Sequence, residues 1–171
     1  MSAALMDQGL RVADADSFSR LIEPLLDPAY RLAAVMLSDR GAAEDAVQEA
    51  AVKAWRKIGQ LRGDAPSLRP WFLAIVANEC RMSRRTRWWS VLKFGELRSG
   101  QEVGESQTDL HRALLRMSPE ERLPLILHFY LDLPLEEVAR TLRVSPAAAR
   151  SRIYRAAKRL RADLTVEDVI R

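Results

Sequence analysis

Residues 133–164 constrain this chain more than any other stretch, because two helix patterns meet there at a helix-start signal. Leu135, Val138, Ala139 and Leu142 recur at spacings of three and four, so they line one face of a short helix. The serine-proline pair at 145–146 predicts a new helix, since serine can accept from free N–H groups and proline lacks the N–H that would stay unpaired. The second helix has its own apolar stripe of Ala149, Ile153, Ala157, Leu160 and Leu164. This pattern predicts a helix-turn-helix.

The charge of the second helix indicates what the unit binds. No Asp or Glu occurs from 138 to 162, and outside the apolar stripe the helix carries Arg150, Arg152, Arg155, Lys158, Arg159 and Arg161. A basic helix is often only a solvated face, but here the helix start, the stripe and the charge coincide. This coincidence favours DNA binding through the major groove. Arg143 occupies the turn, where glycine is common, so we expect a turn of different build or one that bears the cost of a left-handed arginine.

The composition excludes several other classes of protein. The 171 residues are 48% hydrophobic and only 6% aromatic, with no strand pattern and no internal repeat, so we expect an all-α fold. The single cysteine, Cys80, cannot form an internal disulfide and disfavours a metal cluster. Since no glycine-rich phosphate loop or catalytic constellation occurs, we expect no cofactor and no enzymatic activity. The chain lacks a bilayer-spanning apolar run and a signal pattern, which favours a cytoplasmic location.

Helix patterns and their breaks predict the domain organisation. Helices are expected from about 16 to 37 with an interruption or restart at Pro28, over 42–58 after a turn at 38–41, and over 68–87 after a loop. Ser118 with Glu121 three residues later is a capping box, and the stripe that follows should pack on the helix-turn-helix: Leu123, Ile126, Leu127 and Tyr130. We expect a flexible N-terminus (1–15), two small helical domains (16–94 and 110–171) and an acidic, flexible linker (95–109).

Three groups in the first half are further candidate sites, each with an ordinary alternative. The first is a shared helix face that suits a protein partner, although the helix dipole alone explains acids near a helix start; it holds Asp45, Gln48 and Glu49. The second is the loop 60–67 with Asn78, which could read bases or be a plain connector. The third suits phosphate contacts or is a solvated helix end, with Arg81, Arg84, Arg85 and Arg87.

Two motifs in this order resemble a known family. The sequence DAVQEAAVKAWRKIGQLRGD at 45–64, with RPWFLAIVANECR at 69–81, is similar to region 2 of the extracytoplasmic-function (group 4) sigma factors of bacterial RNA polymerase. The sequence LPLEEVARTLRVSPAAARSRIYRAAKRLR at 133–161 is similar to their region 4. The resemblance covers roughly residues 16–164 and includes the acidic linker. It implies a sigma factor that binds core polymerase and directs promoter-specific initiation.

The resemblance implies roles for residues of the first half. The acidic face of Asp45, Gln48 and Glu49 would dock on the β′ clamp helices of the polymerase. The loop 60–67 and the head of the next helix would read the −10 element as a melted single strand, with Asn78 at a flipped base. The residues that would contact −10 DNA are Arg62, Ser67, Asn78, Arg81, Arg84 and Arg85.

For the second half, the resemblance implies contact with the −35 element. Arg150, Ser151, Tyr154 and Arg155 would face the major groove, and His128 would contact the DNA backbone. The linker would thread through the polymerase cleft. The implied partners are core polymerase (β′ clamp helices and β flap), promoter DNA and an anti-sigma factor, often at a membrane, with no small-molecule substrate. Arg143 and Ala147-Ala148 depart from the family pattern, so the promoter sequence does not carry over.

Two other functions remain open on the residues alone. A free-standing helix-turn-helix repressor or activator would use the basic helix but would leave the acidic face and the loop with Asn78 without a role. A helical protein that sequesters a partner would leave the acid-free stretch 138–162 without a role. Cys80 lies among apolar neighbours, which is more typical of a buried, inert thiol than of a redox sensor.

Overall fold

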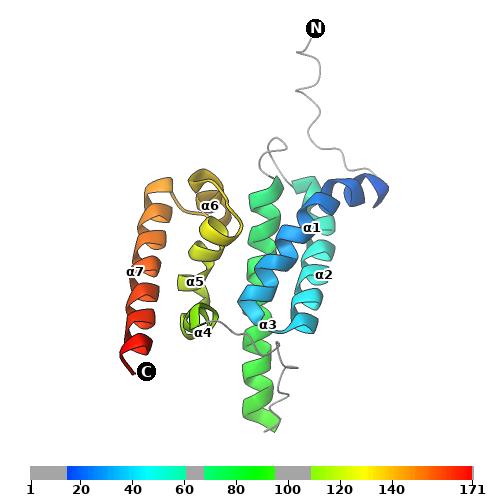
Figure 1. Ribbon diagram of the computed structural model, residues 1–171. Helices are drawn as coiled ribbons and strands as arrows, with labels where there is room; N and C mark the ends of the chain where they lie inside the picture. Colours follow the sequence, from blue (N-terminus) through cyan, green and yellow to red (C-terminus); the bar gives the residue numbers. More distant parts are fainter. Residues whose placement is uncertain (1–14, 61–67, 95–108, 171) are drawn as a thin grey trace.

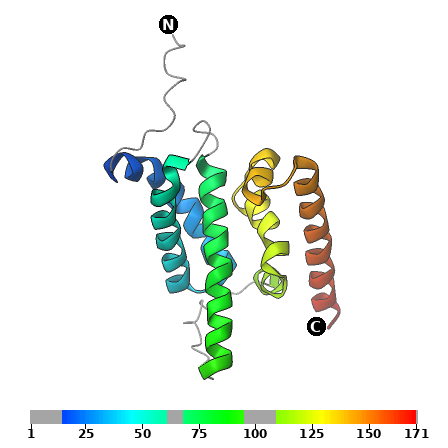
Figure 2. The same ribbon diagram turned by 180° about the vertical axis from the view of Figure 1, so that it is seen from behind.

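Helices joined by short turns make up the part of the protein that the structure describes. The computed structural model describes the backbone of residues 15–60, 68–94 and 109–170, and the side chains of 15–59, 68–84 and 109–164. The elements are α1 (Ala15–Leu37), α2 (Arg40–Lys57), a 3₁₀ turn η1 (Ile58–Gln60), α3 (Leu68–Phe94), α4 (Asp109–Arg116), α5 (Pro119–Leu125), a π-helix η3 (Ile126–Tyr130), α6 (Leu135–Leu142) and α7 (Pro146–Ile170). The predicted all-α fold is confirmed. Figures 1 and 2 show α1–α3 as one bundle and α4–α7 as a second bundle beside it.

Helix α1 continues through both of its prolines. The prediction that Pro28 interrupts or restarts the helix is therefore wrong, since α1 is one helix from Ala15 to Leu37 with Pro24 and Pro28 inside it. A proline in a helix interior costs about 3 kcal/mol. Burying one large apolar side chain returns about 1.5–3 kcal/mol, and α1 buries several, including Ile22, Leu32 and Met36. The free energy gained by packing α1 against α2 and α3 thus exceeds the cost of the two prolines inside the helix.

Helix α2 begins two residues earlier than predicted. Asp39 is its N-cap and accepts a hydrogen bond from the Ala42 amide at 2.8 Å. The expected turn at 38–41 is therefore shorter, and its left-handed residue is Ser38 with φ 54°. The inward face of α2 is mostly alanine and is buried. Trp55, near the end of α2, remains 40% exposed and packs edge-to-face with Phe18, with ring centroids 5.1 Å apart.

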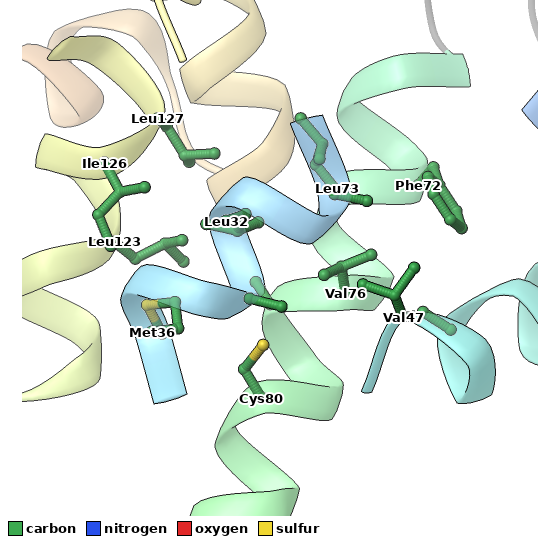
Figure 3. Packing of buried hydrophobic residues seen from close by; sticks show 14 of the residues in the cluster. Leu32, Met36, Val47, Phe72, Leu73, Val76, Cys80, Leu123, Ile126 and Leu127 are labelled. Carbon is green, nitrogen blue, oxygen red and sulfur yellow. The ribbon is translucent and has the colours of Figure 1, made fainter. Parts of the chain in front are cut away.

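The two bundles share one hydrophobic core. The cluster joins Leu32 and Met36 of α1 and Leu73 and Val76 of α3 with residues of the second bundle: Leu123, Ile126 and Leu127 (Figure 3). The predicted stripe from Leu123 to Leu127 is confirmed, and it packs on the first bundle as well as near the helix-turn-helix. Tyr130, the last residue of that stripe, is 45% exposed and lies under the Arg31 guanidinium at 4.6 Å from the ring centroid.

Cys80 is an inert thiol by its position in this core. Its side chain is fully buried on α3, and burial raises its pKa to about 12, with a further contribution from the neighbouring Glu79 carboxylate. Because the thiolate is the reactive form, we expect an aromatic disulfide reagent at neutral pH to leave the native protein unmodified and to label one thiol per chain in denaturant. Rapid labelling without denaturant would contradict this burial and reopen a redox role.

The helix-turn-helix has the caps that the sequence predicts. The Ser145 hydroxyl accepts from the Ala148 amide at 3.2 Å at the start of α7. The capping box of α5 is also present, with the Glu121 amide donating to the Ser118 hydroxyl at 3.3 Å and the Ser118 amide donating to the Glu121 carboxylate at 3.0 Å. Arg143 ends α6 in the left-handed conformation with φ 55° and ψ 46°. The turn therefore has the left-handed residue that glycine commonly provides, and Arg143 adopts this conformation at a cost in free energy.

This strained position predicts a stabilising substitution. A left-handed non-glycine residue costs roughly 1–2 kcal/mol, and glycine adds about 0.5–1 kcal/mol of lost backbone entropy. Arg143→Gly is therefore expected to raise the free energy of unfolding by about 0.5–1 kcal/mol, or the melting temperature by about 1–4 °C. The matched control is Arg140→Gly within α6, which should lower the melting temperature because its backbone is helical. An equal loss of stability in both variants would show that Arg143 is not strained.

Candidate nucleic-acid interface

Helix α7 presents four of the five predicted −35 residues on one exposed face. Arg150, Ser151, Tyr154 and Arg155 are all exposed, Tyr154 by 70%. The opposite face of α7 is held against the second bundle by buried Ala149, Ile153 and Ala156. The exposed set therefore combines two guanidinium groups, a hydroxyl and a phenol on a rigid helix, which are donors suited to base edges and phosphates.

Two other basic or polar residues of the second bundle are engaged within the protein. Arg159 pairs with the Glu121 carboxylate at 2.7 Å, so this cation of α7 ties the helix to the cap of α5. His128 lies on η3 rather than on α7, and its Nδ1 donates to the Leu133 carbonyl at 3.1 Å. Its ring also lies edge-on to Phe129. The structure thus leaves His128 with one ring nitrogen committed to the backbone and separate from the α7 face.

The predicted acidic face lies on the outside of α2. Asp45, Gln48 and Glu49 are exposed, while Ala46, Val47 and Ala50 on the other side of the helix are buried. Glu44, in contrast, forms a local ion pair with Arg40 at 3.1 Å. Among the described residues no ion pair involves Asp45 or Glu49. Two carboxylates and an amide therefore face solvent on a firm helix, as a basic protein partner requires.

The structure describes only part of the predicted −10 set. Arg62 and Ser67 lie outside the described residues, and Arg85 lies on α3 with its side chain outside the described side chains. Asn78 is exposed, with its amide nitrogen 3.7 Å from the Met82 sulfur, and Arg84 is exposed as well. Arg81 is partly buried and faces Glu120 of the second bundle at 3.7 Å.

A basic cavity of about 410 Å³ brings Asn78 and Arg81 together. The first bundle contributes Lys53 and Lys57 of α2 and Glu79 of α3, and the second bundle contributes Thr141, Leu142 and Arg143. Lys53 pairs with Glu79 at 2.6 Å, so the remaining charge in the cavity is positive. The two lysines were not predicted from the sequence. Their spacing of four on α2 was the available signal, but nothing local joins them to Asn78.

An apolar groove of about 520 Å³ is the second feature that the sequence did not reveal. It lies between α4, η3 and α7, and its walls include Leu114 and Leu160. Its rim leaves large apolar side chains in water, with Leu110 exposed by 48% and Phe129 by 62%. Exposed apolar surface of this kind is typical of protein–protein contacts and ligand-binding grooves. In the described chain no helix has the length and apolarity to cross a bilayer.

Family models match each bundle in sequence. Residues 21–90 match the model of sigma-70 region 2, and residues 107–160 match the model of sigma-70 region 4. The RNA polymerase sigma factor SigV of Bacillus subtilis is 31% identical over 144 residues, which cover 82% of this chain and 86% of SigV.

Two solved structures are similar in fold. One is the sigma factor RpoE in complex with the anti-sigma factor NepR from Bartonella quintana, with a TM-score of 0.68 and 24% identity, covering 88% of this chain and 98% of RpoE. The other is CnrH in complex with the cytosolic domain of CnrY, with a TM-score of 0.68 and 21% identity, covering 90% of each chain. At these identities the likeness concerns the fold.

Proposed function

Because the chain belongs to the extracytoplasmic-function group of the sigma-70 family of RNA polymerase sigma factors, we propose that it directs core bacterial polymerase to promoters by recognising −35 duplex and melted −10 DNA. The observation that carries this proposal is the pair of unlike faces on one chain. The acidic face of α2 suits a basic protein partner, and the exposed basic face of α7 suits DNA. A sigma factor of this kind would use binding energy alone, with no catalytic step of its own.

The −35 element would be read by α7. Arg150, Ser151, Tyr154 and Arg155 share its exposed face, and a helix inserted into the major groove reads base edges through such side chains. Each good contact would supply roughly 1–3 kcal/mol of discrimination between bases. His128, held by the Leu133 carbonyl, would contact the DNA backbone beside this site.

The −10 element would be captured by the first bundle. Asn78 has donor and acceptor atoms for one flipped base, and it stands in a positive cavity beside Arg81. Arg84 and Arg85 follow on α3 and would hold phosphates of the nontemplate strand. Arg62 and Ser67, outside the described residues, would complete this contact.

Core polymerase would be bound through both bundles. Asp45, Gln48 and Glu49 would dock on the β′ clamp helices, and the apolar groove beside Phe129 supports a second contact with the β flap. The functional units would be region 2 at 16–94 and region 4 at 110–171. Residues 95–109, of which only Asp109 at the start of α4 is described, would thread through the polymerase cleft. Such a protein acts where the chromosome is, in the cytoplasm.

An anti-sigma factor is a further expected partner. One of the two similar structures is the sigma factor RpoE in complex with the anti-sigma factor NepR, and the other is CnrH in complex with the cytosolic domain of CnrY. Such a partner would cover the exposed acidic face of α2 or the exposed basic face of α7 and so keep the chain from polymerase or DNA.

The deciding experiment is binding of the purified chain to core polymerase that lacks any sigma factor, followed by transcription from a fragmented genomic library. We expect tight one-to-one association and new transcripts with a common promoter sequence. A chain that binds duplex DNA alone but never associates with core polymerase would instead be a free-standing helix-turn-helix regulator.

A further inference from the structure

The two bundles are joined by a bidentate ion pair. Arg69, at the start of α3, donates from Nε and from one terminal nitrogen to the two carboxylate oxygens of Glu137 on α6, both at 2.7 Å. The Glu137 side chain is only 16% exposed and that of Arg69 41%. Paired hydrogen bonds of this kind fix orientation as well as distance. The first helix of the helix-turn-helix is therefore held at a set angle on α3.

A buried cation crosses the same interface. Arg122 of α5 is fully buried, and it donates to the Met36 carbonyl at the end of α1 at 3.3 Å and to the Met117 carbonyl at 3.2 Å. Among the residues that the structure describes, none forms a hydrogen bond with its Nε, and burial lowers its pKa to about 10. A cation at a helix C-terminus is favoured by the helix dipole, but an incompletely satisfied buried guanidinium is costly. The closed arrangement is thus held firmly at Arg69 and carries a cost at Arg122.

Closure affects the two DNA sites differently. Residues 141–143, at the end of α6, wall the cavity that holds Asn78. The α7 face around Arg150 and Tyr154 is exposed in the same arrangement. Region 4 therefore forms one wall of the proposed −10 site and narrows the approach of a DNA strand to Asn78, whose own side chain is exposed, while its own −35 face stays open.

The closed arrangement cannot span a promoter. By their names, the −35 and −10 elements lie about 25 base pairs apart, which is about 85 Å along the duplex at about 3.4 Å per base pair. A compact chain of this length has a radius of gyration of about 16 Å. Because the bundles share one core here, they cannot reach both elements at once, and they must separate before promoter recognition.

We infer that the Arg69–Glu137 ion pair is an interdomain latch, which keeps the end of α6 against one side of the Asn78 cavity until region 4 moves away. This inference rests on the proposed function, because it assigns the −10 strand as the excluded ligand. With the latch closed, the apparent affinity for the −10 strand falls in proportion to the small open fraction. Breaking the latch raises that fraction without touching the α7 face.

The test compares Glu137→Arg with Glu136→Arg in the full-length chain. Glu136 is the exposed neighbour on α6, so its replacement changes the charge equally without touching Arg69. Dyes on Ser19→Cys in α1 and Ala162→Cys in α7 report the distance between bundles by energy transfer, and buried Cys80 does not compete for them. Glu137→Arg should lower energy transfer and tighten binding of a single-stranded DNA with the −10 sequence of a recovered promoter, up to about tenfold. Glu136→Arg should stay near wild type.

A reversed ion pair should restore the closed arrangement. Adding Arg69→Glu to Glu137→Arg reverses the pair and should restore the energy transfer, while −35 duplex binding should be equal in all variants. If Glu137→Arg loses binding of the −35 duplex, the substitution has damaged the fold of region 4. The comparison is then repeated with Glu137→Gln, which removes the charge of the ion pair without reversing it. Equal energy transfer in wild type and in the folded Glu137 variant overturns the latch. If no variant binds core polymerase or any promoter, the proposed function fails, while the energy-transfer result still decides whether the latch exists.

Discussion

The double substitution Arg150→Ala and Arg155→Ala is expected to abolish binding of −35 duplex DNA while leaving core polymerase binding intact. Both guanidinium groups lie on the exposed face of α7, so their loss removes two DNA contacts without opening the core. Contacts of this kind contribute roughly 1–3 kcal/mol each, which predicts a loss of at least about 30-fold in affinity. The measurement is fluorescence anisotropy with a promoter duplex at fixed salt, because phosphate contacts depend on salt.

The matched control for this experiment is Arg20→Ala with Arg56→Ala. These two exposed arginines lie on α1 and α2, so the control removes the same charge from the other bundle. It should bind −35 duplex nearly as the wild type does. An unchanged affinity in the α7 variant, or an equal loss in the control, would mean that α7 is not the recognition helix.

Asp45→Arg is expected to weaken association with core polymerase by at least about 30-fold. Its carboxylate lies on the exposed acidic face of α2, and among the described residues no ion pair uses it, so the fold does not depend on it. Reversing a charge at a complementary interface costs about 2–5 kcal/mol. The affinity is measured by competition against a labelled sigma factor, with −35 duplex binding as the check that region 4 remains folded.

Asp27→Arg is the control for the acidic face. Asp27 is an exposed acid of α1, outside the proposed docking surface, and its reversal changes the net charge equally. Normal polymerase association of Asp45→Arg, or an equal loss with Asp27→Arg, would remove α2 as the docking site.

Local signals in the sequence predicted the second bundle well. The caps at Ser118 and Ser145 and the buried stripe of α7 each depend on residues within one or two turns, and the structure contains them. The prediction at Pro28 was wrong because the cost of a proline inside a helix is smaller than the packing energy of α1. That packing energy depends on residues far away in the sequence. The sequence also predicted which residues share a face on α2 and on α7, and the structure leaves both faces exposed. What these faces bind stays a prediction.

The interface between the bundles was beyond sequence reasoning. Arg69 and Glu137 are separated by 68 positions, and Arg122 and Met36 by 86. A glutamate near a helix start and an arginine in a helix have ordinary local explanations, so neither residue pointed to the other. The basic cavity around Asn78 was missed for the same reason, since its walls come from three helices of two bundles.

The shared core of the two bundles has a consequence for the life of the protein in the cell. Separation of the bundles would bring apolar side chains such as Leu32, Met36, Leu123 and Leu127 into contact with water. A protease that cuts open states degrades a protein in proportion to their population. Copies that open without finding polymerase would therefore be removed first, so the supply of free core polymerase would set how much of this factor accumulates.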